Sequence, residues 1–254
     1  MAKDAVIYTA VFGEKDTVLD LPLQTLECDL VCFTDNPQLN CGPFEKRVVQ
    51  PLYTDPVRNA RMMKILAHRY LSHETTVWMD ANVRVRSPDF MQWAFDSVQG
   101  SEWAVHKHPK RNSVYAEGQR CIEIAKDAPD VLNRQMQDYR RAGYPLAQGL
   151  VMTSILIRRN KSKRVARFNE AWWKEICRYS RRDQMSFNFV AWKRNFQYHC
   201  IGASIFKNPH FEIGEHRISD SLMSYQDLLN HKNAEIQELR QALEQHLKHF
   251  QQPV

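Results

Sequence analysis

Short apolar runs alternate with amphipathic helical segments along most of the chain, and this alternation limits the possible folds more than any other feature. The apolar runs are rich in strand-forming residues and end at turn residues, whereas the helical segments repeat their apolar residues near the helical period. Strands are expected at residues 5–13, 28–36, 75–85, 102–109 and 149–160. Helices are expected at 55–71, at 116–145 with an interruption near Pro129, at 165–180 and at 182–194. This order predicts an α/β fold whose sheet is largely parallel and flanked by helices.

The last part of the chain has a different pattern. Apolar residues repeat there every seven positions, at Leu222, Leu229, Ile236, Leu243 and Phe250. Such a repeat predicts one long helix that forms a coiled coil or packs against the body of the protein. We therefore divide the 254 residues into a domain at 1–218 and a C-terminal amphipathic helix at 219–254, and we expect a homodimer formed through that helix.

The composition is ordinary for a globular protein, with a moderate excess of basic residues. Lys and Arg total 35 against 29 Asp and Glu, a net charge of +6. This excess fits an anionic substrate such as a nucleotide, and it also fits weak affinity for nucleic acid or a membrane surface. The sequence shows no apolar run of ~20 residues, no apolar leader and no C-x-x-C pair among its six cysteines. We expect free thiols and a cytoplasmic protein, peripheral at most to the inner face of a membrane.

Two side chains suited to a metal ion, Asp80 and Asn82, interrupt the apolar stretch TTVWMDANVRV at residues 75–85. In an open α/β sheet, ligands bind beyond the carboxyl ends of strands, and both Asp80 and Asp35 follow an apolar run. Divalent ions such as Mg²⁺ or Mn²⁺ take hard oxygen ligands, which substrate phosphates often supply in part. The D-x-N pair therefore predicts a metal site, although a turn or an Asx cap explains the same spacing.

A basic helix precedes this strand and is a candidate for phosphate binding. Arg58, Arg61 and Lys64 are three residues apart, which puts them roughly on one helix face. Three cations on one face suit a diphosphate, and a solvated helix face is the alternative. Further along, Asp183 and Gln184 stand at an expected helix start, where they form either a cap or a pair that holds a hydroxylated acceptor.

Two other stretches are dense in polar side chains. HKHPKRNSVYAEG has basic, acidic and aromatic residues that can hold a sugar or a phosphate, namely His108, Arg111, Tyr115 and Glu117. NPHFEIGEHR has two histidines, His210 and His216, either of which is a candidate to complete a metal site that begins at Asp80. The chain has no P-loop, dinucleotide-binding, serine-hydrolase or zincin motif, which disfavours those classes of enzyme.

Eight short blocks in a fixed order resemble the TOD/MUCI70-like hexosyltransferases, a glycosyltransferase-like family. The blocks span roughly residues 4–218 and read YTAVFG, CFTDN, R-x-x-R-x-x-K-x-x-x-H, VWMDANVRV, HPKRNSVYAEG, GYPLAQGL, AWWKEI and SRRDQMSF. This family is similar to the glycogenin-like transferases. The resemblance implies a GT-A-like fold, which is a Rossmann-like mixed sheet flanked by helices, here followed by the long C-terminal helix.

The resemblance also implies which residues bind the donor. The nucleotide-sugar site would contain Thr9, Ala10, Val11, Phe12, Asp35, Arg58, Arg61, Lys64, Asp80, Ala81 and Asn82. Asp80-Ala81-Asn82 matches the family's D-x-D position, which binds Mn²⁺ or Mg²⁺ and the diphosphate. Asn82 replaces the second Asp of that motif and removes one negative charge. A histidine near the end of the domain, His216 or His210, would complete the metal site.

Further residues are implied for the reacting sugar and the acceptor. Asp183 and Gln184 match a pair near the reacting sugar in similar enzymes and are the catalytic candidates. The sugar or the acceptor would contact His108, Arg111, Tyr115, Glu117, Gln148, Gly149 and Arg182.

We therefore expect a metal-assisted hexosyltransferase of polysaccharide biosynthesis that uses a nucleotide sugar, with UDP as the nucleotide. Its acceptor would be a glycan or a lipid-linked glycan, and no nucleic-acid partner is expected. The metal and the cations would stabilise the negative charge that grows on the leaving diphosphate. One alternative is a basic protein that binds nucleic acid or another anionic polymer through Trp172, Trp173 and Arg178. Another is a metal-dependent hydrolase on the same fold.

Overall fold

The computed structural model of the protein describes residues 4–13, 16–98, 100–202, 204–214, 236–237 and 239–240. Apart from those four positions near its middle, the helix expected at 219–254 lies outside the described residues. The homodimer expected through that helix, and the candidate ligand His216, lie outside them as well.

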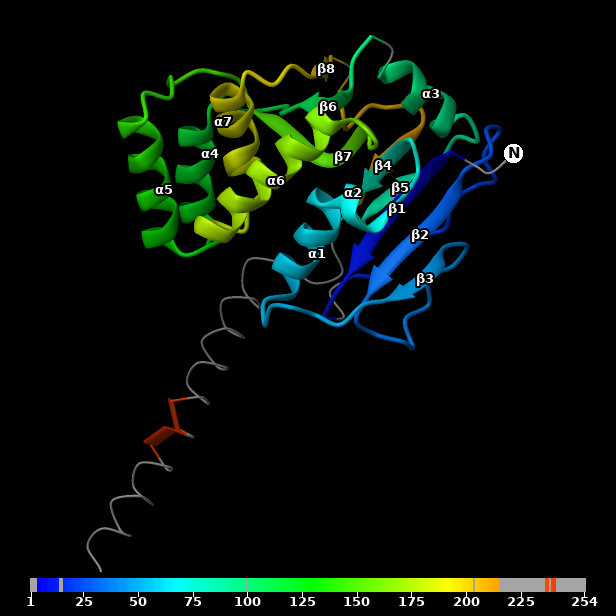
Figure 1. Ribbon diagram of the computed structural model, residues 1–254, viewed down its shortest axis with the longest axis horizontal. Coiled ribbons are helices and arrows are strands. Elements are labelled where there is room, and N and C mark those ends of the chain that lie inside the picture. Colours follow the sequence, from blue (N-terminus) through cyan, green and yellow to red (C-terminus); the bar gives the residue numbers. More distant parts are fainter. Residues whose placement is uncertain are drawn as a thin grey trace, which may run out of the picture.

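A seven-stranded sheet forms the centre of the fold, in the order β3-β2-β1-β4-β7-β6-β8 (Figure 1). Its strands are β1 (Ala5–Val11), β2 (Asp29–Thr34), β3 (Glu45–Val48), β4 (Thr75–Met79), β6 (Trp103–Lys107), β7 (Val151–Arg159) and β8 (His199–Ile201). Neighbouring strands are parallel except at β7, which is antiparallel to both β4 and β6. The α/β fold with a mixed sheet is therefore confirmed. The chain passes through two helices, α4 (Val114–Glu123) and α5 (Pro129–Arg141), between β6 and β7. The first helix leads away from the carboxyl end of β6 and the second leads back to it, so β7 starts at that end and runs antiparallel to β6.

The strand expected at residues 75–85 is interrupted at Asp80. β4 ends at Met79, and the amide of Val83 then donates to the carbonyl of Asp80 over 2.9 Å. The chain continues as β5 (Val83–Val85), which leaves the main sheet and pairs antiparallel with β9 (Phe211–Ile213). The stretch expected as one strand is therefore two strands joined by a turn of the D-x-N residues, and Asp80 follows the first of them, as the sequence predicted. This turn lies at the carboxyl end of β4, next to that of the parallel strand β1.

Seven helices pack on the sheet in the described part of the chain. They are α1 (Pro56–Ile65), α2 (Ala67–Tyr70), α3 (Phe90–Ser97), α4 (Val114–Glu123), α5 (Pro129–Arg141), α6 (Lys163–Arg178) and α7 (Gln184–Arg194). The interruption expected near Pro129 in the helical stretch 116–145 is confirmed, since α4 ends at Glu123 and Pro129 begins α5. Asp55 caps α1 by accepting from the amide of Val57, and Pro56 occupies the first turn, where a missing N–H costs nothing. Helices α4 to α7 gather at one end of the molecule, away from β2 and β3 (Figure 1).

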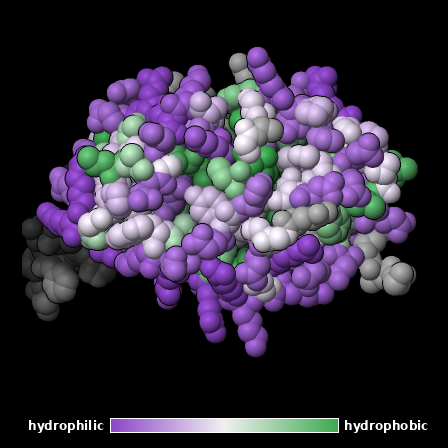
Figure 2. Space-filling view, turned by 90° about the horizontal axis from the view of Figure 1, so that it is seen from above, coloured by the Kyte–Doolittle hydropathy of each residue, from purple (hydrophilic) through white to green (hydrophobic). Residues whose placement is uncertain are grey.

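Successive strand residues face opposite sides of the sheet, so each side has its own core. Tyr8 and Trp78 pack in the larger cluster with side chains of α1, α6 and α7, whereas Ile7 and Val77 pack in the other with side chains of α3. Hydrophilic side chains cover most of the surface seen from above, with hydrophobic ones in small groups among them (Figure 2). In the described residues, no helix is both long and apolar enough to span a bilayer.

Candidate functional site

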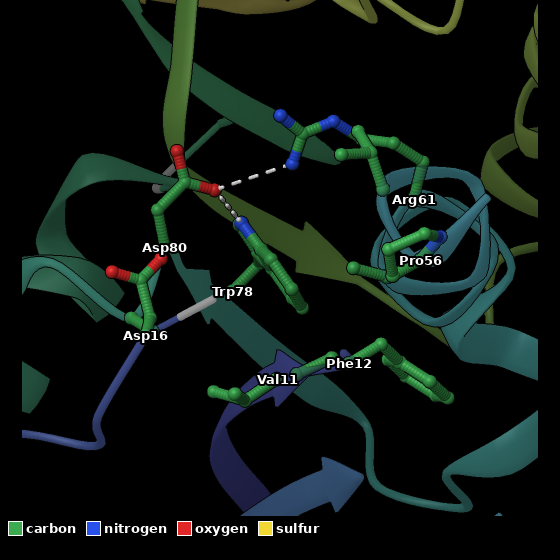
Figure 3. Close-up of a pocket in the computed structure, with 11 residues that line it drawn as sticks. Val11, Phe12, Asp16, Pro56, Arg61, Trp78 and Asp80 are labelled. Atoms are coloured by element: carbon green, nitrogen blue, oxygen red, sulfur yellow. Dashed lines mark hydrogen bonds and ion pairs between the residues drawn. The ribbon is translucent and has the colours of Figure 1, made fainter. Parts of the chain in front are cut away.

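A pocket opens at the carboxyl ends of β1 and β4, beside the first turns of α1 (Figure 3). The space inside it, part of which is open solvent, amounts to about 480 Å³. Its lining residues are Ala10, Val11, Phe12, Asp16, Pro56, Val57, Ala60, Arg61, Trp78, Asp80 and Ala81. One wall is therefore apolar and comes from the end of β1, while the opposite wall presents a guanidinium and a carboxylate.

Asp80 directs one carboxylate oxygen toward three donors. Its Oδ1 accepts a hydrogen bond from the Trp78 indole at 2.8 Å and lies 3.2 Å from the Lys64 ammonium and 3.8 Å from the Arg61 guanidinium. All of these contacts go to Oδ1, and those from Trp78 and Arg61 are drawn as dashed lines in Figure 3. The carboxylate is thus held in place through Oδ1, and none of these contacts from the described residues uses its second oxygen.

Asp183, at the start of α7, shares the cations that contact Asp80. The Lys64 Nζ atom lies 2.6 Å from its Oδ2, and the Arg61 Nε atom lies 3.4 Å from its Oδ1. The hydroxyl of Thr153 also donates to Oδ2, over 2.9 Å. Lys64, Arg61, Asp80 and Asp183 form a charge-balanced group, which we call the charged quartet. The side chains of Lys64 and Asp183 are 0% and 2% exposed, so most of this group is below the pocket surface.

The environment of the charged quartet shifts the pKa of both of its most buried members. Burial raises the pKa of Asp183, but Arg61, Lys64 and Arg182 lower it by more, so that this pKa lies well below its ordinary value. Burial lowers the pKa of Lys64, and Asp183 and Asp80 oppose that effect without cancelling it. The Lys64 nitrogen lies within 3.2 Å of both carboxylates, which favours its charged form.

Asp183 is also a helix cap, as one interpretation of the sequence held. Its Oδ1 accepts from the amide of Gln184 over 3.2 Å at the start of α7, where the helix dipole favours a negative charge. Because its carboxylate is buried and paired, its evident effect is to position Lys64 and Arg61 at the pocket.

Arg158 on β7 supports the charged quartet from below, and sequence reasoning missed it. It is fully buried, donates to the Tyr8 hydroxyl, and donates to the backbone carbonyl of Lys64 over 2.8 Å. The Tyr8 hydroxyl donates to the same carbonyl over 2.8 Å. Both side chains therefore fix the backbone of Lys64. The only signal in the sequence is an arginine that follows the apolar run SILI.

Asn82, the second residue of the D-x-N pair, is tied to the end of β9. Its amide nitrogen donates to the carbonyl of Gly214 over 2.7 Å, and the amide of Gly214 donates back to the carbonyl of Asn82 over 2.9 Å. The Oδ1 atom of Asn82 is buried and has no hydrogen-bond partner among the residues that the structure describes. A buried oxygen without a hydrogen-bond partner is suited to bind a cation or to accept a hydrogen bond from a ligand.

The structure argues against His210 as the histidine that completes a metal site. Phe211 pairs with Val85, so His210 lies at the opposite end of the short β5–β9 ribbon from Asn82. There its ring stacks on Trp93, with ring centroids 5.7 Å apart. The other candidate, His216, is outside the described residues. Within them, no group of three or more His, Cys, Asp or Glu side chains is placed to hold a metal ion.

A family model for the TOD1/MUCI70, glycosyltransferase-like domain matches residues 46–213, more than half of the chain. The chain belongs to this family. The matched region contains the charged quartet and the D-x-N turn, whereas β1, which forms the apolar wall of the pocket, precedes it. Family membership indicates glycosyl transfer as the general activity.

Comparison with solved structures finds mouse xyloside xylosyltransferase 1 in its apo form. The two chains are 9% identical, the match covers 78% of this chain and 84% of that one, and the TM-score is 0.41. This likeness is too low to support an argument about the present chain. No curated protein matches the sequence.

In this glycosyltransferase-like domain, a second group of predicted residues lies next to the charged quartet. The amide nitrogen of Gln184 donates to the carbonyl of Val151 over 3.2 Å, and its oxygen accepts from Arg182 over 3.4 Å. Arg182 and Glu117 both adjoin the thiol of Cys121, whose pKa burial raises to about 11. Polar contacts thus continue from Asp183 through Gln184 and Arg182 to α4.

The same line of contacts ends at three residues predicted for the acceptor. Arg111 forms an ion pair with Glu117, and the His108 Nε2 atom lies 3.9 Å from the same carboxylate. The Nδ1 atom of His108 accepts from the amide of Arg111 over 2.9 Å, which leaves the ring in its neutral form with Nδ1 as an acceptor. Burial lowers the pKa of His108, and Arg111 adds to this effect while Glu117 opposes it.

Other predicted residues lie away from the pocket. Thr9 is fully buried within β1, and Arg58 donates to the carbonyl of Ile176 on α6 over 2.6 Å. Three residues turn a helix by about 300°, which is 60° short of a full turn. Arg58 is therefore about 120° from Lys64, and the three cations do not share one face. Asp35 follows β2 as predicted, and its carboxylate accepts from the amide of Gly13 at 3.2 Å.

Three other residues predicted to bind the acceptor, namely Tyr115, Gln148 and Gly149, make contacts elsewhere in the fold. The hydroxyl of Tyr115 donates to the carbonyl of Tyr144 over 2.8 Å. Gln148 lines a separate pocket with Trp192, and Gly149 adopts a φ of 78°, which favours glycine. These contacts do not connect the three residues to the charged quartet.

The aromatic residues proposed for nucleic-acid binding are in the core. Trp172 and Trp173 are 0% and 9% exposed, and the Trp172 indole donates to the backbone carbonyl of Asp183 over 3.2 Å. Neither ring offers a face on which a base could stack, so this alternative loses the residues on which it depended.

Proposed function

We propose that this glycosyltransferase-like domain transfers a sugar from a nucleoside-diphosphate sugar to a hydroxyl group, and that the pocket beside Asp80 holds the diphosphate. The main supporting observation is that Arg61 and Asp80 line one pocket whose opposite wall is the apolar end of β1. A nucleotide sugar has the matching parts, since its base is flat and largely apolar at its faces while its diphosphate is anionic.

The residues present fit a divalent cation with few protein ligands. Asp80 offers its second oxygen, and Asn82 offers a buried Oδ1 without a partner among the described residues. Mg²⁺ and Mn²⁺ are commonly bound by one or two side-chain oxygens together with substrate phosphates and water. We propose Mn²⁺ or Mg²⁺ at Asp80 and Asn82, with His216 as a further ligand. When bound, this ion would neutralise charge on the diphosphate.

The cations of the charged quartet supply the remaining stabilisation of the leaving group. Negative charge grows on the diphosphate as the bond to the sugar breaks, and a fixed guanidinium stabilises it most where water is excluded. Arg61 reaches the pocket surface, whereas Lys64 is buried below it. Arg61 is therefore the direct contact, and Lys64 and Asp183 keep it and Asp80 in position.

The side chains around the pocket suggest where the nucleotide of the donor and the acceptor glycan would bind. Val11 and Phe12 would lie against the nucleotide, for which we propose UDP, near Asp35. The acceptor glycan would lie toward Gln184, Arg182 and the His108–Arg111–Glu117 cluster, since this line of polar side chains begins at the charged quartet. We propose a hexose as the transferred sugar, with Asp183 and Gln184 near it.

Release of UDP from a panel of UDP-hexoses, measured by chromatography with Mn²⁺ and a mixture of glycan acceptors, tests the proposal. Arg61→Gln should lower kcat/KM by about 10²- to 10³-fold, as expected for a group that stabilises developing charge. Glu123→Gln, a change on the exposed face of α4, is the control and should keep full activity. Equal activity of the two variants would contradict the assigned role of the pocket, and failure of the wild type with every nucleotide sugar would contradict the reaction.

A further inference from the structure

The positive charge of the chain is concentrated in one region. Residues 129–195, which include α5, α6 and α7, contain 15 Lys and Arg against five Asp and Glu, a net charge of +10. The whole chain has a net charge of +6, so the remaining residues together are negative. A charge separation of this size creates a field around one end of the molecule, where α5 to α7 gather (Figure 1).

Helix α6 presents five of these 15 cations to solvent as one stripe. Its exposed cations are Lys163, Arg164, Arg167, Lys174 and Arg178. At 100° per residue they fall within an arc of about 100° and extend over about 22 Å of helix. The acidic residues of α6 point to neighbouring helices, since Glu170 binds Arg69 of α2 and Glu175 accepts from the Tyr139 hydroxyl of α5. Few acids therefore neutralise the stripe.

Cations of the two neighbouring helices reach the same surface. A hollow of about 600 Å³ lies where α5, α6 and α7 meet, and Arg141, Arg178 and Lys193 all line it. Each of the three helices contributes one of these residues. The hollow also contains two acids, Glu175 and Asp138, and Asp138 lies 3.1 Å from Arg141 and 3.9 Å from Arg178. The stripe and the hollow together form one basic surface, which we call the α5–α7 surface.

Exposed apolar side chains adjoin this basic surface. Trp192 is 39% exposed and directly precedes Lys193 and Arg194 on α7, and Leu146 is 66% exposed. The Trp192 ring packs on Tyr144, two residues before Leu146, with centroids 5.3 Å apart. Tryptophan and leucine beside lysine and arginine are typical of proteins that rest on the interface of an anionic bilayer.

We propose that the α5–α7 surface docks the domain on a membrane that contains anionic lipids, with Trp192 and Leu146 entering the headgroup region. A lipid surface fits better than a nucleic acid, because the cations lie on exposed helices without aromatic rings arranged for base stacking, and the apolar side chains require a partner with a nonpolar layer. The proposal does not depend on the sugar-transfer reaction, because lipid binding is measured without a substrate.

Sedimentation of the full chain with vesicles tests this proposal. The probes are vesicles of phosphatidylcholine and vesicles in which about a third of the lipid is phosphatidylglycerol. We expect binding only to the anionic vesicles and weaker binding as salt is raised. The triple variant Lys163→Gln, Lys174→Gln, Lys193→Gln should bind about 100-fold more weakly, because each cation near an anionic surface adds a comparable increment.

A matched triple variant distinguishes the effect of the α5–α7 surface on lipid binding from the effect of the net charge of the protein. Lys46→Gln, Lys107→Gln and Lys207→Gln remove three exposed lysines outside the α5–α7 surface, so both triple variants have the same net charge. The matched variant should stay within about threefold of the wild type, and Trp192→Gln with Leu146→Gln should bind about tenfold more weakly. Equal losses in the two lysine variants, binding to neutral vesicles, or tighter binding to duplex DNA than to anionic vesicles would overturn the proposal.

Discussion

The charged quartet and the α5–α7 surface use the same kinds of residue in opposite ways. In the quartet, each of the two cations lies within 3.8 Å of both carboxylates, and all four side chains are mostly buried. On the α5–α7 surface, cations are exposed and far outnumber the acids. Paired, buried charges fix a geometry, because removal of one leaves another without a partner. Exposed, unbalanced charges create a field, and each one affects the stability of the fold little.

The largest predicted effect is the loss of the central cation of the quartet. Lys64→Met removes the ammonium that contacts both Asp80 and Asp183 and leaves a buried carboxylate incompletely paired. Removing one partner of a buried ion pair commonly costs about 3–5 kcal/mol of unfolding free energy. Urea denaturation of the purified variant measures this cost.

A double variant shows whether the unpaired charge is the cause. Asp183→Asn in the Lys64→Met background removes the buried negative charge, so part of the lost stability should return. If the double variant is less stable than Lys64→Met by the full cost of Asp183→Asn alone, then the two residues are not coupled.

A smaller effect is expected at Arg158, which supports the quartet through the backbone. Arg158→Met removes donors to the Tyr8 hydroxyl and to the Lys64 carbonyl but leaves no carboxylate unpaired. We expect a loss of about 1–3 kcal/mol, the usual cost of unmade buried hydrogen bonds. If urea denaturation shows that Arg158→Met loses as much unfolding free energy as Lys64→Met, then the hydrogen bonds of Arg158 stabilise the quartet as much as its ion pairs do.

The depressed pKa of Asp183 makes part of the stability depend on pH. A carboxyl whose pKa is lower when folded than when unfolded stabilises the fold fully above its unfolded pKa, and this contribution is lost as the pH falls toward the folded pKa. The unfolding free energy of the wild type should therefore fall below about pH 4. Asp183→Asn should lack this part of the fall, so that the two stability curves converge in acid. Parallel curves in urea denaturation at a series of pH values would contradict the assignment.

The sequence predicted the ends of strands better than the contacts between them. Asp35 and Asp80 were placed beyond β2 and β4 because apolar runs followed by polar residues mark such ends. β3, with the sequence EKRV, has no apolar pattern and was missed, as were the short strands β8 and β9 and the helix α3.

Ion pairs between residues that are far apart in the sequence could not be predicted from the sequence. Lys64 and Asp183 are 119 positions apart, and nothing in local spacing links them. The helical period explains why Arg61 and Lys64 reach the site and Arg58 does not, yet only the position of α6 shows where Arg58 binds instead. Arg158 lies in an apolar strand, where its role depends on Tyr8 from another strand.

The smallest effect is predicted on the α5–α7 surface. Lys174→Gln changes an exposed side chain of the α6 stripe and should alter the unfolding free energy by less than about 0.5 kcal/mol. Urea denaturation checks this value beside that of Lys64→Met. A loss above about 2 kcal/mol would show that this lysine stabilises the fold and would remove the contrast between the two regions.

Calorimetric titration of UDP, with and without Mn²⁺, into the wild type and Asp80→Ala tests the central claim most directly, namely that Asp80 binds the metal–diphosphate unit. Glu123→Gln serves as the control for a carboxylate removed elsewhere. We expect Mn²⁺ to strengthen UDP binding to the wild type and the control by at least about tenfold, and Asp80→Ala to lose this enhancement. An Asp80→Ala protein that stays folded and binds UDP with the same Mn²⁺-dependent affinity as the wild type would contradict this role of Asp80.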